Sequence, residues 1–599
     1  MFVPYQVHTP FTDAICHRGY AKGGVLRAAR CRSFQSDHLA VQRHGRRSGC
    51  LGGERSVIGS VEPAASEMRQ LGGDYMKLVK SLMLGSAASL FTMAAAQAAD
   101  LPVKAKAVEY VRICSLYGAG FWYIPGTDTC IKLGGFVRAE TILNGGGSHR
   151  PAWSGDLAQG NRFADQLTAR SRFVFNVDTR TATEYGVVRT FSQAYFDFNN
   201  FGTTNPSALG AAPASLGGFN TNLLMGAGGG YAYVDLIFIQ FAGFTFGRSV
   251  SAFQTPWGGY PANNTAWLIG GQDSITGVNN IQYQAQFGSG VSATIGLEDP
   301  TQYDRTPLYN LALGIGASGL GTNAYEGWVW PDLNGNIRVD QAWGLFQLSG
   351  SLHHVGGTYN VLGAGGVPVS GATALTDSVL SGHPDSKLGG SVMAAFQIRN
   401  LPTGPGDDIK FDTTWAKGQT KQVISTSANS PSFAMLGGVP GQFGPSGSYG
   451  FGATSDGVYL PTAFGGDGAI HLTTAYGVRG GYNHNWDPHW STGVYGGAGW
   501  LKYDGTAAAE FCAAFGVTHP GLGATYSCNP NFGAAMIGTV TRWTPVKNLT
   551  LSGEIQLFHL HQNFSGFSTF SPGAPQPVQN WTFHDQNALS LDIRVQRNF

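Results

Sequence analysis

The feature that most constrains this chain is a two-residue period in polarity that recurs along many short segments. In residues 281–287 every odd position is apolar or aromatic and every even position is Gln, and after Gly288-Ser289-Gly290 the period resumes over 291–298. This alternation predicts a β-hairpin with one apolar face and one wet face. The same period predicts strands within residues 131–140, 171–178, 346–353, 388–399, 409–416, 472–479 and 589–599.

The connections between these segments alternate between short and long. Short ones lie near 179–183, 242–243, 288–290, 344–345, 400–408, 486–489 and 544–548. Long stretches rich in Gly, Ser, Asn and Pro occupy 141–168, 197–230, 250–278, 299–336, 355–386, 417–470, 504–534 and 561–586. Seven short turns and eight long loops join sixteen strands. This organisation predicts an all-β, 16-stranded antiparallel transmembrane β-barrel with short periplasmic turns and long extracellular loops.

A soluble β-sandwich is the alternative, because its strands also alternate and bury their apolar face against a second sheet. Only 12% of the residues are charged, about half the usual share of a soluble domain. Lipid is further favoured by the biased loop lengths, by an export signal, and by aromatic residues near strand ends, where membrane proteins place interfacial girdles. These aromatic residues are Tyr283, Phe287, Trp343, Trp415, Trp486, Trp490, Trp543 and Phe599.

Residues 76–98 have the three parts of a secretory signal peptide: basic Met76 to Lys80, an apolar stretch, and a small-residue end at Ala96-Gln97-Ala98. We expect cleavage between Ala98 and Ala99. A signal that begins 75 residues into a chain cannot act at the N-terminus, so we interpret residues 1–75 as a mis-assigned, disordered extension. Beyond the signal no run of 18 apolar residues appears, which excludes spanning helices.

The cysteines and charges support the same cut. Removing residues 1–98 leaves 25 basic and 30 acidic residues, a net charge of −5, which implies no nucleic-acid partner. Four of the seven cysteines remain, in two local pairs whose members are 16 positions apart. We predict disulfides Cys114–Cys130 and Cys512–Cys528 over the two other connectivities, since disulfides persist in exported proteins. Zinc is the competing interpretation, but the ligand spacing is absent. We expect residues 99–130 to form an N-terminal periplasmic segment and residues 131–599 the barrel.

If the apolar positions face lipid, the alternation directs the intervening charged residues into the lumen. A lipid-facing Arg or Lys at the membrane midplane costs about 2–4 kcal/mol, whereas a water-filled lumen tolerates it. Together such charges filter ions, although each one alone can be a solvated wall residue. The predicted pore-lining residues are Arg138, Glu140, Arg170, Arg172, Asp178, Glu298, Arg338, Asp340, Lys387, Arg399, Lys410, Asp412, Arg479, Arg542, Glu554 and Arg594.

The sequence predicts no catalytic site, cofactor or metal. No G-x-S-x-G motif lies in the strand–turn–helix context that a hydrolase nucleophile needs. The pairs His353-His354 and His559 with His561 have the chemistry to bind a metal, but we interpret them as rim or wall residues because no partner for the histidines is evident.

Two segments carry a family resemblance. Residues 76–140, with Ala99-Asp-Leu-Pro-Val-Lys after the signal and Cys114-Ser-Leu-Tyr-Gly-Ala-Gly-Phe-Trp-Tyr-Ile-Pro-Gly further on, resemble the start of the alphaproteobacterial general porin family of rhizobia and Brucella. The run Phe-Ala-Gly-Phe-Thr-Phe-Gly-Arg at 241–248 and the terminal Phe599 also fit. The resemblance implies a homotrimer in outer-membrane lipid, passive diffusion of small hydrophilic solutes and ions, and recognition of Phe599 by the barrel-assembly machinery.

The same resemblance implies that the third long loop, residues 250–278, folds into the lumen and forms the constriction. Within it we single out Gln254, Trp257, Trp267 and Asp273. Asp273 is the only charge in this loop, which departs from the acid-rich constriction loop of many porins and removes the usual basis for cation selectivity. Deleting part of residues 254–267 is expected to raise conductance.

Two other function classes remain open. One is an outer-membrane hydrolase, which needs a catalytic cluster on the outer wall of the barrel. The other is a substrate-specific channel or surface adhesin, in which long loops such as 417–470 bind a ligand or host surface. Liposome swelling with sugars of graded size separates these classes, because a general porin shows a smooth size cut-off and a specific channel shows saturation.

Overall fold

The computed structural model describes residues 112–144, 167–199, 230–263, 268–272, 276–301, 305–371, 373–425, 432–438, 443–572 and 576–599. The chain divides after Lys106, and every described residue belongs to the part from Ala107 to Phe599. The predicted signal peptide with its cleavage site at Ala98 and Ala99, and the loop residues Trp267 and Asp273, lie outside the described residues.

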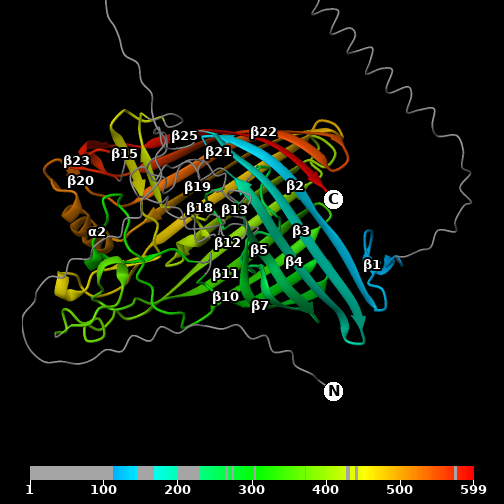
Figure 1. The fold of residues 1–599 in the computed structure, drawn as a ribbon, viewed down its shortest axis with the longest axis horizontal. Helices are drawn as coiled ribbons and strands as arrows, with labels where there is room; N and C mark the ends of the chain where they lie inside the picture. Colours follow the sequence, from blue (N-terminus) through cyan, green and yellow to red (C-terminus); the bar gives the residue numbers. More distant parts are fainter. Residues whose placement is uncertain are drawn as a thin grey trace, which may run out of the picture. The chain divides into compact units, whose positions relative to one another are not determined.

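Sixteen strands in the described part of the chain form one antiparallel sheet (Figure 1). In chain order they are β2 (Thr129–Leu143), β3 (Leu167–Thr183), β4 (Gly186–Asn199), β5 (Gly230–Phe241), β6 (Phe244–Val250), β7 (Gly277–Gly288), β8 (Val291–Glu298), β10 (Asp332–Gln341), β11 (Gly344–Val355), β12 (Lys387–Arg399), β13 (Asp408–Lys417), β18 (Thr474–Asn485), β19 (Trp490–Lys502), β21 (Phe532–Val546), β22 (Leu549–Gln562) and β25 (Gln586–Asn598).

The sheet closes on itself because its first and last strands pair. β25 is antiparallel to β2, with register from Phe136 opposite Asn598 to Leu143 opposite Leu591. Each strand otherwise pairs with the next barrel strand in the chain, including β8 with β10 and β13 with β18. Closure leaves no unpaired edge, which a strand-built membrane protein requires. The predicted 16-stranded antiparallel barrel is therefore confirmed.

The two faces of the wall have opposite polarity. Along β25 the outward side chains of Leu591 and Ile593 are 36% and 59% exposed, whereas Asp592 and Arg594 between them point inward and are each 6% exposed. This period-two pattern places an apolar band on the outside and polar groups on the inside, the reverse of a soluble barrel.

The strands join through short turns at one end, called here the turn end, and through long connections at the other, the loop end. Two predicted turns are misplaced. Residues 179–183 lie inside β3, and the turn is Glu184–Tyr185; residues 344–345 begin β11, and the turn is Ala342–Trp343. The threonines of 179–183 belong to the strand because β-branched residues fit a pleated surface, and Thr179 hydrogen-bonds the opposite Thr190 at 2.5 Å.

The long connections at the loop end are folded rather than structureless. They contain β9 (Leu308–Asn310), β14 (Phe433–Leu436), β15 (Ser448–Gly452), β16 (Gly457–Tyr459), β17 (His471–Leu472), β20 (Tyr526–Ser527), β23 (Ser565–Phe570), β24 (Gln579–Phe583), the short 3-10 helices η7 (Leu311–Leu313), η8 (Ala364–Gly366), η9 (Thr420–Gln422) and η10 (Thr462–Phe464), and the helix α2 (Gly505–Thr518). Figure 1 shows β15, β20, β23 and α2 gathered at one end of the barrel.

Helix α2 lies where the sequence predicts only a loop, in residues 504–534. Asp504 caps it, since its carboxylate accepts a hydrogen bond from the backbone N–H of Ala507 at 2.8 Å. The alanines at 507–509 favour a helix, but their weak periodicity conceals it in the sequence. No helix among the described residues has the length and apolar character needed to cross a membrane.

A short N-terminal segment lies at the turn end. It comprises η1 (Ser115–Tyr117) and β1 (Trp122–Tyr123), which pairs with the start of β2 through Trp122 and Ile131. Both predicted disulfides are confirmed: Cys114–Cys130 ties this segment to β2, and Cys512–Cys528 ties α2 to the residues before β21.

Candidate pore and constriction

The connection between β6 and β7 is called here the lumen loop, and its described residues, 251–263, 268–272 and 276, lie inside the barrel. Its first part contacts the wall formed by β8, β10 and β11. The backbone N–H of Ala252 donates to Glu298 at 2.8 Å, and its carbonyl accepts from Asn336 at 2.6 Å. Gln347 donates to the carbonyl of Gln254 at 2.6 Å. The start of the loop is thus held by inward side chains of three strands.

The middle of the lumen loop is attached to β13 and β18. The Tyr260 hydroxyl donates a hydrogen bond to the carboxylate of Asp412, which also forms an ion pair with Arg479 at 3.0 Å. Arg479 in turn donates to the carbonyl of Gln272 at 2.7 Å. Asp412 and Arg479 were both predicted as pore-lining residues, and the structure places them beneath the loop as its anchors.

Asn263 reaches β22 and β25. Its backbone N–H donates to Glu554 at 2.7 Å, and its side chain accepts from Ser552 at 3.0 Å and donates to Asp592 at 3.3 Å. Its carbonyl accepts from Arg594 at 2.5 Å. The lumen loop therefore extends from β6 to strands that close the barrel near its C-terminus, and it narrows the lumen between these points.

Glycines let the lumen loop approach the wall closely. Gly270 has a φ of +111°, which an L side chain rarely adopts, and its N–H donates to the carbonyl of Val423 at 3.1 Å. On β19, a Cβ at Gly497 would lie 2.1 Å from the carbonyl oxygen of Ile269. These two positions need glycine because backbone touches backbone there.

Charged side chains of β2, β3, β4 and β25 form a second feature of the inner wall, called here the arginine wall. Glu140 lies between two arginines, accepting from Arg170 at 2.5 Å and from Arg594 at 2.6 Å. Arg172 forms a bidentate pair with Asp197, with both distances 2.6 Å. The arginine wall consists of Arg138, Glu140, Arg170, Arg172, Asp197, Asp592 and Arg594.

The remaining predicted pore-lining residues also occupy inward positions of their strands. Arg338 donates to Gln347 at 2.9 Å, and Arg542 donates to the carbonyl of Ala262 in the lumen loop at 3.2 Å. Lys387 is exposed at the loop end of β12. At the turn end, Asp340 pairs with Arg399 at 2.7 Å, Lys410 lies 3.4 Å from Asp408, and Asp178 pairs with Arg180 and Arg189.

Several residues that shape the site are missing from the sequence prediction. The sequence predicts a loop at Asp197 because the stretch from 197 is rich in Asn and Gly, yet Asp197 lies within β4, opposite Arg172. Asp592 lies two residues before Arg594 on β25 and points inward like it, so alternation alone could have identified Asp592 as a residue of the inner wall. Tyr260 and Asn263 lie in a loop without periodicity, and no sequence signal distinguishes them.

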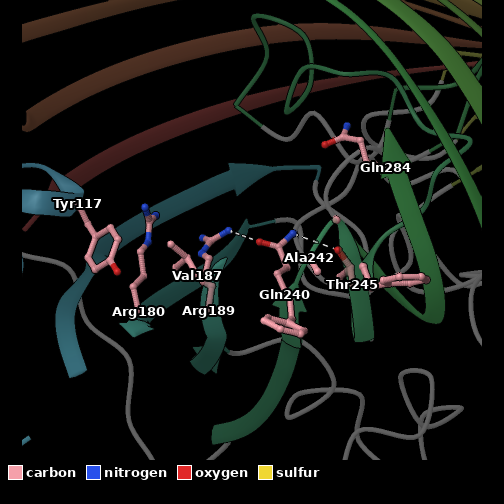
Figure 2. Close-up of a pocket in the computed structure, with 11 residues that line it drawn as sticks. Tyr117, Arg180, Val187, Arg189, Gln240, Ala242, Thr245 and Gln284 are labelled. Carbon is pink, nitrogen blue, oxygen red and sulfur yellow. Dashed lines mark hydrogen bonds between the residues drawn. The ribbon is translucent and has the colours of Figure 1, made fainter. Parts of the chain in front are cut away.

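A cavity of about 340 Å³ opens at the turn end between the N-terminal segment and the ends of β3 to β6 (Figure 2). Arg189 donates to Gln240 at 2.9 Å, and Gln240 donates to Thr245 at 3.1 Å. The guanidinium of Arg180 lies over the ring of Phe121, 4.9 Å from its centroid. Arginines therefore line this cavity as well as the arginine wall.

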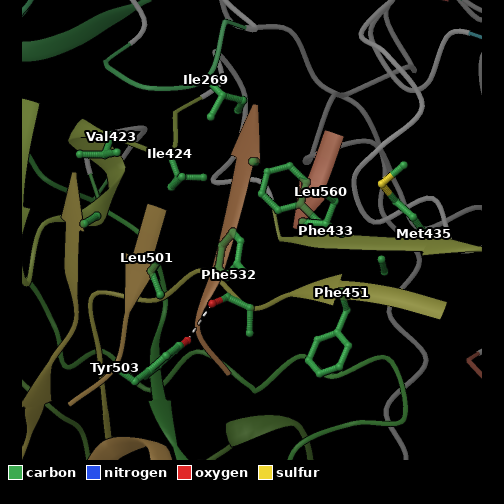
Figure 3. Close-up of a cluster of buried hydrophobic side chains, with 14 of the residues drawn as sticks. Ile269, Val423, Ile424, Phe433, Met435, Phe451, Leu501, Tyr503, Phe532 and Leu560 are labelled. Atoms are coloured by element: carbon green, nitrogen blue, oxygen red, sulfur yellow. Dashed lines mark hydrogen bonds between the residues drawn. The ribbon is translucent and has the colours of Figure 1, made fainter. Parts of the chain in front are cut away.

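Beside the arginine wall, folded loops cover the inner face of β13, β18, β19, β21 and β22 at the loop end, called here the covered wall. Small and apolar inward residues of these strands pack against the lumen loop, the connection after β13 and α2 (Figure 3). Phe433 of β14 is fully buried, with its ring 5.7 Å from that of Phe532 and 5.4 Å from that of Phe558. Buried side chains of the loops therefore fill this part of the lumen at the loop end.

A closed barrel with an apolar outside, a polar inside and a loop within its lumen defines an outer-membrane β-barrel of the channel-forming class. The family model described as "Porin subfamily" matches residues 100–591. The chain belongs to this family.

Curated relatives are found in Brucella. The porin Omp2b of Brucella suis is 32% identical over 277 residues, which cover 44% of this chain and 64% of that protein. Omp2b of Brucella abortus (strain 2308) is also 32% identical over 277 residues and is covered to 63%. The match thus spans slightly less than two thirds of these relatives. Among solved structures, the outer-membrane channel DcaP of Acinetobacter baumannii aligns with 80% of this chain and 99% of its own, at 14% identity and a TM-score of 0.49.

Proposed function

We propose that the protein is an outer-membrane porin whose water-filled lumen lets small hydrophilic solutes and ions diffuse passively. The observation that carries this proposal is the inner wall: charged and amide side chains line it from β2 round to β25, while apolar side chains cover the outside. A lumen that excluded water would leave these inward charges with a large desolvation cost. Family membership supports the same function.

The path runs between the lumen loop and the part of the arginine wall on β2, β3 and β4, because Asp592 and Arg594 on β25 contact Asn263 of the loop. The covered wall is filled by the buried side chains of the loops, and the lumen loop is attached to it through Gly270 and Tyr260. Fixed arginine and carboxylate charges facing each other in a narrow passage focus the field and select ions by sign. The sixteen predicted pore-lining residues keep this role in the proposal, with those under the lumen loop acting as its anchors.

Single-channel conductance in a planar bilayer, with the reversal potential under a salt gradient, tests this function. Stepwise openings with ohmic conductance are expected from the purified, folded protein. A correctly folded barrel without conductance would overturn the proposal and favour a plugged receptor. Liposome swelling with graded sugars adds a second readout, in which saturation instead of a smooth size cut-off would indicate a substrate-specific channel.

The lumen loop is proposed as the constriction, with Gln254 and Trp257 in its described part and Trp267 and Asp273 as the further predicted members. Gly497→Ala places a methyl group against the carbonyl of Ile269 and must push the loop away from β19 into the proposed path, so conductance is expected to fall. Gly480→Ala on neighbouring β18 is the matched control, because its nearest contact of 3.6 Å is ordinary. Equal conductance in both variants would remove the loop from the constriction.

The assembly and export of the protein are further parts of the proposal. We infer a homotrimer in outer-membrane lipid, delivered through a signal peptide cleaved between Ala98 and Ala99 and inserted by the barrel-assembly machinery. We propose that the machinery recognises Phe599 before closure; in the closed barrel the backbone N–H of Phe599 donates to Gly135 of β2 at 3.1 Å. Openings in groups of three, and an N-terminal sequence beginning at Ala99, are the expected results.

A further inference from the structure

A cluster of metal-ligating side chains lies outside the pore, on strands β22 and β25, which are neighbours in the sheet (Figure 1). Phe558 and Leu560 of β22 point inward and are fully buried. His559 and His561 therefore point outward, near the loop end of the strand. The sequence presents them only as an i, i+2 histidine pair, which by itself is an ordinary feature of a wall.

The register supplies the partner that the sequence does not reveal. His559 lies opposite Asn587, and Leu560 lies opposite Gln586, the first residue of β25. Asp585 directly precedes that residue and comes beside His561. A His-x-His segment thus faces an Asp-x-Asn segment across two antiparallel strands, with all four polar side chains on the outer face.

The three strongest ligands among these side chains converge on one point. Asp585 Oδ2 lies 2.8 Å from Nδ1 of His561 and 3.9 Å from Nε2 of His559. One ligand atom from each of the three residues lies within 4.8 Å of the other two. The two printed distances bracket the separation of about 3.3–3.6 Å between ligand atoms that share a tetrahedral metal ion with bonds of about 2.0–2.2 Å.

Hydrogen bonds to other atoms of His559 and Asp585 orient the remaining nitrogen and oxygen of these side chains toward the same centre. Nδ1 of His559 lies 2.9 Å from Oδ1 of Asn587, which leaves Nε2 for a metal. The other carboxylate oxygen of Asp585 accepts the backbone N–H of Gln562 at 2.9 Å, and Oδ2 shares with Nδ1 of His561 a hydrogen bond of 2.8 Å, which a bound metal ion would replace. Hydrogen bonds of this kind orient metal-binding side chains and set their tautomer.

The site is accessible and has room. The side chains of His559, His561 and Asp585 are 43%, 53% and 39% exposed. On the other side of β22, the residues opposite the two histidines are Ala535 and Gly533, which are too small to cover them. An ion can therefore enter from outside and keep a coordination position for water.

We propose that His559, His561 and Asp585 form a binding site for a divalent transition-metal ion, with Zn²⁺ as the best fit. Two imidazoles and one carboxylate, with water as the fourth ligand, suit tetrahedral Zn²⁺. Ca²⁺ and Mg²⁺ prefer sites built from oxygen alone. This site is independent of the pore and of the proposed diffusion function, and Asn587 is its positioning residue.

Zn²⁺ titration of the folded chain, purified in detergent without a polyhistidine tag, tests the proposal. Competition with a chromophoric chelator is expected to show one tight Zn²⁺ per chain. His561→Ala and Asp585→Asn are each expected to weaken binding at least about tenfold, and Asn587→Ala by about tenfold, as for loss of an outer partner. His584→Ala is the matched control, since this neighbouring histidine is also exposed and lies outside the cluster.

A Co²⁺-loaded sample gives a readout of the ligands themselves, because its visible spectrum reports tetrahedral coordination and nitrogen ligands. That spectrum is expected in the wild type and in His584→Ala, and is expected to be lost in His559→Ala. Heat-modifiable migration on a gel verifies that each variant is folded. Binding of Zn²⁺ that is equal in the wild type and in folded His561→Ala, or displacement of Zn²⁺ by an equal concentration of Ca²⁺, would overturn the assignment.

Discussion

The arginine wall and the covered wall are built on the same strand alternation, yet their inward positions serve different purposes. On β2, β3 and β25 those positions carry long charged side chains, which pair across strands as Glu140 does with Arg170 and Arg594. At the loop end of β18 to β22 they carry Gly, Ala, Leu and Phe, and folded loops cover them. The difference teaches that a closed barrel can keep one side of its lumen wet and use the other to hold its loops.

The two walls also differ in what stabilises them. The covered wall resembles the core of a soluble domain, because rings such as Phe451 and Phe564, with centroids 4.7 Å apart, bury apolar area. The arginine wall depends on charge pairs such as Arg172 with Asp197, whose loss on one side leaves the other charge uncompensated. Changes in the covered wall should therefore affect stability, and changes in the arginine wall should affect ion selectivity.

The largest effect is expected from emptying the core of the covered wall. Phe433→Ala removes a fully buried ring that packs on Phe532 and Phe558, and should lower the free energy of unfolding by about 3–5 kcal/mol. Denaturant unfolding followed by tryptophan fluorescence measures this loss. Phe346→Ala on the outer face, where the ring is exposed, is the control and should cost clearly less. Equal losses would mean that the loops contribute no core.

A somewhat smaller loss is expected from opening the loop disulfide. Replacing Cys512 and Cys528 together by Ser frees α2 from the chain before β21, and should reduce stability by about 3 kcal/mol in the chain-entropy model. Limited proteolysis should then cut within residues 505–531 first. If instead the cut pattern and the unfolding midpoint match the wild type, the packing of α2 alone holds this loop.

The arginine wall is tested by removing one positive charge whose loss leaves no buried carboxylate without its ion-pair partner. Arg138→Gln takes away an inward guanidinium that donates to Gln596 at 2.8 Å, and should raise the cation-to-anion permeability ratio by about twofold. The reversal potential under a salt gradient measures it. Arg597→Gln changes the net charge equally at an exposed position of β25 on the outward side, so the reversal potential should stay unchanged. A shift of equal size there would assign selectivity to total charge rather than to the wall.

The smallest effect concerns the junction between two covering loops. Partial burial opposes the charged form of His471, but its hydrogen bonds to Asp467 at 2.9 Å and Asp504 at 3.2 Å outweigh this and raise its pKa. Because the pKa of His471 is higher in the folded chain than in the unfolded chain, its pairing with the two carboxylates stabilises the fold fully at pH values below the pKa of the unfolded chain. This stabilisation is lost as the pH rises through the pKa of the folded chain. The contribution should stay below about 1 kcal/mol because both carboxylates are half exposed. The protection of the amides of residues 460–475 from hydrogen exchange, taken relative to the intrinsic base-catalysed rate, should fall as pH rises in the wild type and lose this dependence in His471→Asn.

Alternation was enough to predict most of the barrel but little of the lumen. Residues 281–298 and 589–599 show their strands and faces directly, because each side chain meets either lipid or the lumen and the period is strictly two. The disulfide partners followed from their local spacing. By contrast, Tyr260 and Asn263 contact strands more than 150 and 280 residues further along the chain, and a local pattern contains no information about such contacts.

The sequence by itself determined the fold class, the strand number, the outer and inner faces and the two disulfides, because these depend on local periodicity and on chain spacing. Only the tertiary structure decided which inward charges hold the lumen loop. It also decided that the loops form a buried core on one side, and that Asp585 meets His559 and His561. Each of these depends on pairing and closure, which bring together residues that are distant in the chain.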